Sequence, residues 1–600
     1  MSLQEFLSAS QQVLRDSSTN ATAATLIFGL VTSMLTTQPA HENLAERING
    51  AEFDFIIVGG GSAGCVVANR LSEIKSWKIL LIEAGLEESV MSRIPAYKSF
   101  SQTLNSSIIF PYMTEAEPAT CAGSPCFWPT GKVLGGSSTI NTLLYARGFK
   151  KDYDKWHDMG NYGWDWITVL QYFKKSENNL DPKYAKYIKY HSTGGYQSVQ
   201  MFPYQDMNVY TVLDAYKELG YSNTDYNGPH PTGVFLVQGT VKDGFRMSTN
   251  DAFLTPVRNR KNLVVATGIR ATKIIINDET KTAIGVEYAV ENDREYKGSV
   301  YASKDVVISA GAIESPHLLM LSGIGPQETL QKLGIPVIKD SKVGYNLINH
   351  PTSVGVTLNL TDSSTFPASK AEWLAHIDQF VRYHKGPLSS IGLSQLSGYI
   401  PSSKATVDYP DLKYGFSFSD ASTGAAFLPS SYYNRITIGP YLVRPQSRGY
   451  LTINSRNPFD QPLIFPRMLS NPDDRKRLID GHLFAFKLAS AQVFRDKNIF
   501  IDTTKERGCE NEEFGTEEYF GCVLDHYVGT AHHLAGTCKM GPYKDPDAVV
   551  DPELKVHGIS NLRVVDVSIV PESPSSNTNA PAIMIAEKAS DMIKDAYWRM

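Results

Sequence analysis

The sequence predicts an α/β fold that combines a parallel sheet with a second, separate sheet. Three observations support this prediction. A strand, a glycine-rich loop, a helix and a strand follow one another near residue 60, and further short apolar runs occupy 262–266 and 305–310. Residues 355–500 instead carry alternating strands, such as 450–453, and many aromatic residues and prolines. Continuous β-branched runs are typical of parallel strands covered on both faces, and alternation is typical of antiparallel sheets. A chain of 600 residues has room for two large domains.

The first unit contains two strands joined by a helix. Residues 53–58 (FDFIIV) and 78–82 (KILLI) are the strand-like runs, and residues 62–74 carry apolar side chains at helical spacing. Glu83 follows the second run and is placed to accept hydrogen bonds from a ribose diol. This order is typical of a βαβ unit that binds a dinucleotide. The alternative is a glycine-rich turn within another α/β fold.

The loop GGGSAG between the first strand and the helix supplies the phosphate site. Gly59 permits the tight turn, Gly61 lets the backbone approach a pyrophosphate, and Gly64 lets helix and strand pack closely. The phosphates then face the helix N-terminus at Ser62 and Ala63, where unpaired N–H groups and the helix dipole favour negative charge. The unit therefore predicts a Rossmann-like dinucleotide site, but it does not by itself distinguish FAD from NAD.

A second glycine-rich segment occupies residues 131–141 (GKVLGGSSTIN). Its small and hydroxylated residues allow the backbone to lie against a flat ring or a phosphate, although a plain surface loop is the alternative. Residues 311–325 follow the run at 305–310, and we expect a helix there that starts near Ser315 and Pro316, because proline suits a first helical turn.

The C-terminal stretch combines a strand, a helix and several polar residues. Residues 562–566 (LRVVD) predict a strand that ends in an acid, and residues 581–594 predict a helix with proline in its first turn. Upstream lie His532 and His533, and histidine beside a cofactor can act as a general base near neutral pH. From the residues alone, each histidine is more often structural than catalytic.

Composition excludes some classes of partner and leaves the location open. A net charge of −5 gives no basic footprint, which argues against nucleic acid, and no cysteine spacing indicates a zinc site. Residues 23–35 (AATLIFGLVTSML) have the length of a signal-peptide core and are too short for a stable membrane span. A short lead-in helix is the alternative, so extracellular and intracellular locations both stay open.

In a secreted protein Cys121–Cys126 and Cys509–Cys522 are the natural disulfide pairs, and Cys65 and Cys538 are expected to be buried thiols.

From about residue 50 onward the chain resembles the glucose–methanol–choline (GMC) oxidoreductases. Four blocks match in order: 59–64, 131–150 (GKVLGGSSTIN followed by LYARG), 311–325 and 530–594. Two sequence segments, CFWPTGKVLGGSS and GTCKMGP, resemble the insect branch of the family, which includes glucose dehydrogenases and ecdysone oxidases.

The resemblance implies a Rossmann-like FAD-binding domain and an antiparallel-sheet substrate-binding domain. We expect the division to fall as follows: a lead or signal segment at 1–50, the FAD-binding domain at 51–350 with insertions near 90–130 and 155–240, mainly the substrate-binding domain at 351–530, and a return to the FAD-binding domain with the catalytic residues at 531–600.

The resemblance also implies roles for individual residues. His533, three residues before Gly536, matches the base that removes the hydroxyl proton, and Asn577, eleven residues before Lys588, matches its partner. Ile140 stands where some members attach FAD through histidine, so the FAD is expected to be non-covalent. The remaining cofactor contacts are expected from Glu83 at the ribose, Val265 at adenine, Gly135, Ser138 and Asn141 at the flavin, and Asp566, Asn579 and Ala580 at the pyrophosphate, ribityl chain or ring.

The expected reaction is oxidation of an alcohol to a carbonyl by hydride transfer to flavin N5. His532 and Leu534 depart from the Tyr-His-Pro usual in the insect branch, and residues 573–576 also depart from the family pattern. These departures, with the apolar texture of 355–440, favour an ecdysteroid 3-hydroxyl with O2 as acceptor. A sugar dehydrogenase with a quinone-type acceptor is the near-equal alternative. A catalytically silent FAD-binding protein is the third hypothesis, against which the intact His533 and Asn577 argue.

Overall fold

The computed structural model describes residues 44–98, 107–362, 364–367, 369–419 and 429–598. Two large sheets organise these residues. The predicted leader at 23–35 lies outside the described residues, and the first described helix is α3 (Ala45–Ile48).

The first sheet has seven strands in the order β11-β2-β1-β14-β13-β12, with β26 paired to β14. Pairing is parallel from β11 through β2 and β1 to β14 and β26, and antiparallel from β14 through β13 to β12. β2 is buried along its whole length, as expected for a strand covered on both faces. The parallel strands predicted from the apolar runs are thereby confirmed. The bounds are β1 Glu52–Val58, β2 Ile79–Glu83, β11 Leu263–Thr267, β12 Ile269–Asn277, β13 Thr282–Val290, β14 Asp293–Ile308 and β26 Leu562–Val564.

The second sheet has eight strands in the order β24-β18-β21-β20-β19-β7, with β17 paired to β21 and to β25. All its pairs are antiparallel. Buried and half-buried residues alternate along β21, because helix α13 (Pro472–Ala489) packs against this strand. The predicted antiparallel sheet is confirmed. The bounds are β7 Gly233–Leu236, β17 Pro351–Ser353, β18 Val356–Leu360, β19 Leu396–Ile400, β20 Leu412–Ser419, β21 Arg435–Leu442, β24 Ile499–Ile501 and β25 Val528–Thr530.

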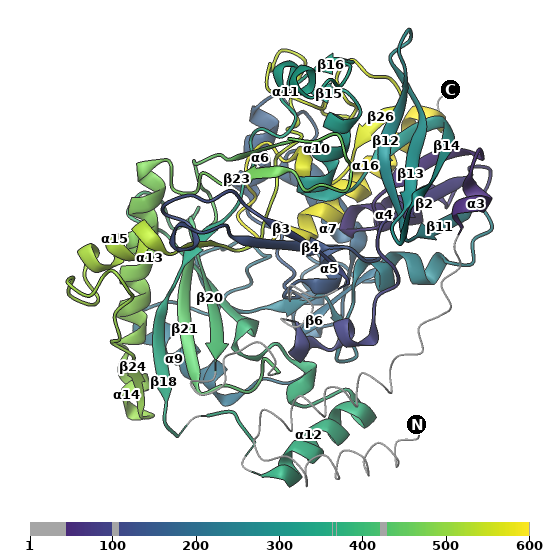
Figure 1. Cartoon of the computed structure of the whole chain (residues 1–600). Coiled ribbons are helices and arrows are strands. Elements are labelled where there is room, and N and C mark those ends of the chain that lie inside the picture. The colour runs from purple at the N-terminus through teal and green to yellow at the C-terminus, as the bar shows by residue number, and fades with distance from the viewer. Residues whose placement is uncertain (1–43, 99–106, 363, 368, 420–428, 599–600) are drawn as a thin grey trace.

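Chain segments far apart in sequence meet beside the first sheet. Helix α4 (Ser62–Leu71) packs against the C-terminal helix α16 (Asn579–Trp598), and the buried Arg70 of α4 pairs with the buried Glu587 of α16 at 2.7 Å. Figure 1 shows β2, β13 and β14 at the upper right with α4 and α16, and β18, β20 and β21 at the lower left. The C-terminal block thereby returns to the sheet that carries the glycine loop.

Shorter elements fill the space around the two sheets. The strand predicted at 450–453 is β22 (Tyr450–Thr452), which pairs with β23 (Leu463–Phe465) in a two-stranded sheet of its own. The further small strands of the described residues are β3 Ile109–Met113, β4 Phe127–Gly131, β5 Glu177–Asn179, β6 Gln197–Met201, β8 Gln238–Gly239, β9 Val241–Lys242, β10 Phe245–Arg246, β15 Ile324–Gly325 and β16 Lys339–Asp340. The further α-helices of the described residues are α5 Ser137–Ile140, α6 Lys150–Asp158, α7 Trp166–Ser176, α8 Pro182–Ala185, α9 Met207–Glu218, α11 Gln327–Lys332, α12 Lys370–Tyr383, α14 Gln492–Asp496 and α15 Glu517–His526.

The expected start of a helix near Ser315 and Pro316 is wrong. Helix α10 runs from Gly311 to Leu321 and contains Pro316 in its interior. Proline has no N–H, so the carbonyl of Ala312 loses its usual partner within the helix. The hydroxyl of Thr537 donates to that carbonyl at 2.7 Å. A distant side chain therefore replaces the missing hydrogen bond and allows the helix to begin four residues earlier.

The cysteine predictions are confirmed by two disulfides, Cys121–Cys126 and Cys509–Cys522, and by buried thiols at Cys65 and Cys538. Among the described residues, no helix has the length and apolarity needed to cross a membrane. Within the same residues, no group of three or more His, Cys, Asp or Glu side chains could hold a metal ion.

Candidate active site

The glycine loop makes a tight connection between β1 and α4. Gly59 has a φ of +100°, and a Cβ there would lie 2.5 Å from the carbonyl oxygen of Ser309. A Cβ on Gly64 would lie 1.8 Å from the carbonyl oxygen of Gly59. At Gly61, by contrast, a Cβ would meet nothing closer than 3.8 Å, and this residue faces a cavity. The loop therefore closes through two glycines and leaves room for a ligand at the third.

The second glycine-rich segment lies directly against the first. The N–H of Gly135 donates to the carbonyl of Gly60 at 2.8 Å, and a Cβ on Gly136 would lie 2.6 Å from Cα of Gly61. The Ser138 hydroxyl donates to the carbonyl of Gly135 at 2.6 Å. The buried guanidinium of Arg246 donates to Oδ1 of Asn141 at 2.7 Å. These contacts fix the segment as one wall of the cavity, which excludes the plain surface loop that the residues left open.

Two buried carboxylates, Glu83 and Asp566, lie on the wall of this region. Glu83 accepts hydrogen bonds from the N–H groups of Gly60 at 2.7 Å and Gly85 at 2.8 Å, and burial raises its pKa to about 7. Asp566 accepts from the N–H of Gly311 at 2.9 Å and the hydroxyl of Ser315 at 2.6 Å. Glu83 thus ties the end of β2 to neighbouring loops and Asp566 bonds the first turns of α10, while both carboxylates remain on the cavity wall.

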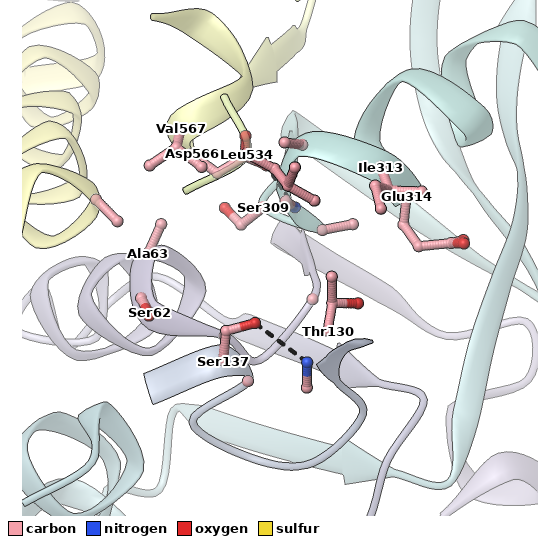
Figure 2. A pocket seen from close by; sticks show the side chains of 18 of the residues that line it. Ser62, Ala63, Thr130, Ser137, Ser309, Ile313, Glu314, Leu534, Asp566 and Val567 are labelled. Carbon is pink, nitrogen blue, oxygen red and sulfur yellow. Dashed lines mark hydrogen bonds between the residues drawn. The ribbon is translucent and has the colours of Figure 1, made fainter. Parts of the chain in front are cut away.

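A cavity of about 310 Å³ runs between these segments. Figure 2 shows its wall: Ser62 and Ala63 at the start of α4, Ser137 below them, and Asp566 and Leu534 above. The predicted site residues on this wall are Gly59, Gly61, Ser62, Ala63, Glu83, Asn141, His533, Asp566, Asn577 and Asn579. The predicted residues that do not line it are Gly64, Gly135, Ser138, Val265 and Ala580. Gly64, Gly135 and Ser138 support the two glycine segments instead, and Val265 pairs with Leu81 inside the first sheet.

His533 and Asn577 meet on the wall of this cavity. Nε2 of His533 lies 2.9 Å from Nδ2 of Asn577, and Nδ1 of His533 lies 2.9 Å from Nδ1 of His350. Nε2 of His350 in turn bonds the hydroxyl of Ser573. An imidazole held by partners at both nitrogens is positioned to receive a proton from a hydroxyl group that enters between His533 and Asn577.

Two residues that contact this pair, His350 and Lys413, were not predicted from the sequence. His350 precedes β17, which pairs with β25 just upstream of His533, and the carbonyl of His350 accepts from the N–H of Ala531 at 3.0 Å. Lys413 lies on β20 and is buried, with Nζ bonded to Oδ1 of Asn577. A histidine before a strand and a lysine inside one carry no local signal of function, because only sheet pairing brings them to the site.

The electrostatics keep His533 in its basic, neutral form. Burial lowers the pKa of His533 well below 6.5, and His350, Lys413 and His532 lower it further by repulsion. Only the deprotonated imidazole can act as a base, so with His533 in that role activity would be present above this lowered pKa and lost as the pH falls through it. We therefore expect the acid limb of kcat/KM to lie well below pH 6.5 in a pH–rate profile. An acid limb near pH 6.5 would contradict the buried environment.

The chain matches known proteins along most of its length. The family models named GMC oxidoreductase match residues 53–352 and 445–586. The chain belongs to the GMC oxidoreductase family. It is 41% identical over 555 residues to a glucose dehydrogenase [FAD, quinone] of Drosophila melanogaster, a match that covers 91% of this chain and 87% of the relative. It is 34% identical over 573 residues to an ecdysone oxidase of Bombyx mori, a match that covers 92% and 83%. These relatives place it in the insect branch of the family.

Solved structures show the same architecture. A formate oxidase superposes with a TM-score of 0.80 at 27% identity, covering 92% of this chain and 99% of the other. A pyridoxine 4-oxidase superposes with a TM-score of 0.75 at 27% identity, covering 91% and 99%. The chain is accordingly an FAD-dependent oxidoreductase that acts on alcohol groups.

The residues on the cavity wall fit FAD. Gly61 leaves open space beside the N-terminus of α4, where N–H groups and the helix dipole favour a pyrophosphate. The carboxylate of Glu83 lies at the end of β2 with unused lone pairs suited to a ribose diol. Ile140 also lines the cavity and offers no nucleophile for a covalent link.

Proposed function

We propose that this enzyme oxidises the hydroxyl of an apolar alcohol of steroid type, with His533 as the base and Asn577 as its partner. The observation that supports the roles is the 2.9 Å contact between Nε2 of His533 and Nδ2 of Asn577 on the wall that the glycine loop also lines. A base and a hydrogen-bond donor meet there at one point beside the dinucleotide site.

The reaction requires loss of a proton from the hydroxyl and of a hydride from the carbon. FAD supplies the hydride acceptor when bound. His533 accepts the hydroxyl proton at Nε2, and its low pKa keeps that nitrogen free at neutral pH. The amide of Asn577 donates to the hydroxyl oxygen and does not compete as a base. The two residues thereby align the alcohol and stabilise the charge that develops on its oxygen.

Apolar side chains on the cavity wall favour an apolar substrate. Ile140, Leu144 and Leu534 line the same cavity, and Leu534 follows His533 directly. A sugar site needs many convergent polar groups, whereas a largely apolar wall suits a sterol. The ecdysone oxidase relative supports this substrate class. We assign the second sheet, which carries Lys413, to the substrate side.

A sugar with a quinone-type acceptor is the second candidate. The glucose dehydrogenase relative, at 41% identity, favours it. The two candidates also differ in acceptor, because oxygen uptake is expected for an oxidase and dye reduction without oxygen uptake for a quinone-linked dehydrogenase.

A substrate panel tests the proposal. We expect ecdysone to bleach the flavin absorbance of the anaerobic holoenzyme, and glucose, choline and an aryl alcohol to do so at least tenfold more slowly, since each missing apolar contact costs about 1–3 kcal/mol. Oxygen uptake and dye reduction are read in parallel. Faster bleaching by glucose would overturn the steroid assignment in favour of the sugar. Failure of every alcohol in the panel to bleach the flavin would overturn both substrate assignments.

A further inference from the structure

Lys413 is a buried cation whose position relates it directly to the catalytic pair. It lies near the start of β20, only 5% exposed, and its Nζ bonds Oδ1 of Asn577. It also lies near the ring of Tyr399, with Nζ 5.7 Å from the ring centroid. Lys413 does not line the cavity, so any effect on a substrate must pass through Asn577.

The donor character of lysine gives direction to a chain of hydrogen bonds. An ammonium group only donates, so the amide oxygen of Asn577 faces Lys413 and the amide NH2 faces His533. That NH2 donates to Nε2 of His533, which must therefore be the unprotonated ring nitrogen. The ring proton then resides on Nδ1 and is donated to Nδ1 of His350.

The remaining bond of the chain agrees with this direction. If Nδ1 of His350 accepts, its proton must be on Nε2, which bonds the hydroxyl oxygen of Ser573. The chain Lys413, Asn577, His533, His350 and Ser573 thus has one consistent set of donors and acceptors. The amide of asparagine can exchange its donor and acceptor ends, and a neutral histidine can carry its proton on either nitrogen. The direction of the chain must therefore be set by a group at one end that can only donate, which is the ammonium of Lys413.

We propose that Lys413 is a positioning residue that sets the tautomer of His533 by fixing the amide of Asn577. This inference rests on the proposed role of His533 as the base. Without the lysine the amide can turn over and present its oxygen to His533, which stabilises a proton on Nε2. That tautomer cannot accept the hydroxyl proton, so part of the enzyme population becomes inactive. Burial lowers the pKa of Lys413 to about 7, so at pH 6 the group is mainly the ammonium that only donates, whereas the neutral amine at higher pH also has a lone pair that can accept.

The kinetic test compares Lys413→Met with Lys413→Arg in the holoenzyme. We expect Lys413→Met to slow anaerobic flavin reduction about 10- to 100-fold, a part of the usual contribution of acid–base catalysis. The arginine guanidinium only donates, as the ammonium does, so Lys413→Arg should recover most of the rate. In an Asn577→Ala background Lys413→Met should cause no further loss of rate.

Lys588→Met is the matched control, because Lys588 is also buried but packs over Trp164 and Tyr172 outside the cavity. Equal rates for wild type and Lys413→Met, or additive losses in the double variant, would overturn the proposal.

A second measurement tests the proposal without using turnover. Nitrogen-15 NMR of protein labelled at its 13 histidines distinguishes the two neutral tautomers, and His533→Asn assigns the resonance. At pH 6 we expect His533 to carry its proton on Nδ1 in wild type and to show a mixture in Lys413→Met. An unchanged tautomer in Lys413→Met would refute the inference even in an active enzyme. The expected shift in a protein that oxidises no alcohol would uphold the inference and reject the proposed function instead.

Discussion

Replacing His533 by alanine is expected to remove almost all alcohol oxidation while FAD stays bound. The change deletes the only group of the pair that can accept the hydroxyl proton, and general-base catalysis contributes on the order of 10²–10⁴-fold. The side chain contacts Asn577 and His350 but does not support the glycine loop, so the dinucleotide site should remain intact. Stopped-flow bleaching of the flavin under anaerobic conditions measures the loss, and the flavin-to-protein absorbance ratio measures retention.

Two other histidines provide the controls. His532 precedes the proposed base and also lines the cavity, so His532→Ala separates the two neighbours. We expect it to keep the rate within a fewfold of wild type. His376, bonded to the Tyr432 hydroxyl at 3.0 Å on α12, reports the effect of losing a histidine elsewhere. Unchanged bleaching by His533→Ala, or a comparable loss in His532→Ala, would reject the assignment of the base.

Local patterns were sufficient to predict the part of the fold that binds the dinucleotide. The strand, loop and helix around Gly59 and Gly64 are adjacent in sequence. The turn itself gives Gly59 a positive φ, and Gly64 packs against the carbonyl of Gly59 five residues earlier. The start of α10 was mispredicted for the opposite reason. The hydrogen bond that tolerates Pro316 comes from Thr537, 225 residues after the carbonyl that it satisfies. A proline rule applied locally cannot include such a partner.

The sequence predicted the two polar residues that meet on the cavity wall but not the two that lie behind them. His533 and Asn577 were found because they stand at fixed distances from motifs that resemble a known family. His350 and Lys413 reach the site through the pairing of β17 with β25 and through the position of β20 in the second sheet. Sheet register is a long-range property, and a single lysine in a strand gives no sign of which groups it will face. The residues behind the proposed base were therefore the ones that the sequence did not reveal.

Replacing Gly64 by alanine is expected to destabilise the first sheet and to release FAD. The added Cβ would lie 1.8 Å from the carbonyl oxygen of Gly59 and 3.0 Å from its carbonyl carbon, so the backbone itself must move. Overpacking of this kind lowers the free energy of unfolding by about 1–3 kcal/mol or more. Because the displaced turn is the one that faces the phosphates, a similar loss in binding weakens FAD affinity about 5- to 150-fold. Flavin content after purification and thermal unfolding of the apoprotein measure the two effects.

Two further glycines separate packing from cofactor binding in this experiment. At Gly439 on β21 an added Cβ would meet nothing closer than 4.0 Å, so Gly439→Ala controls for the loss of a glycine and should change neither property. Gly61→Ala fits the apoprotein, because its Cβ would meet nothing closer than 3.8 Å, yet it intrudes where the pyrophosphate approaches. We expect Gly61→Ala to lose FAD with little change in apoprotein stability, whereas Gly64→Ala loses both. Full flavin content in Gly64→Ala would mean that the close contact with Gly59 is not required, and full content in Gly61→Ala would mean that the pyrophosphate does not lie against this loop.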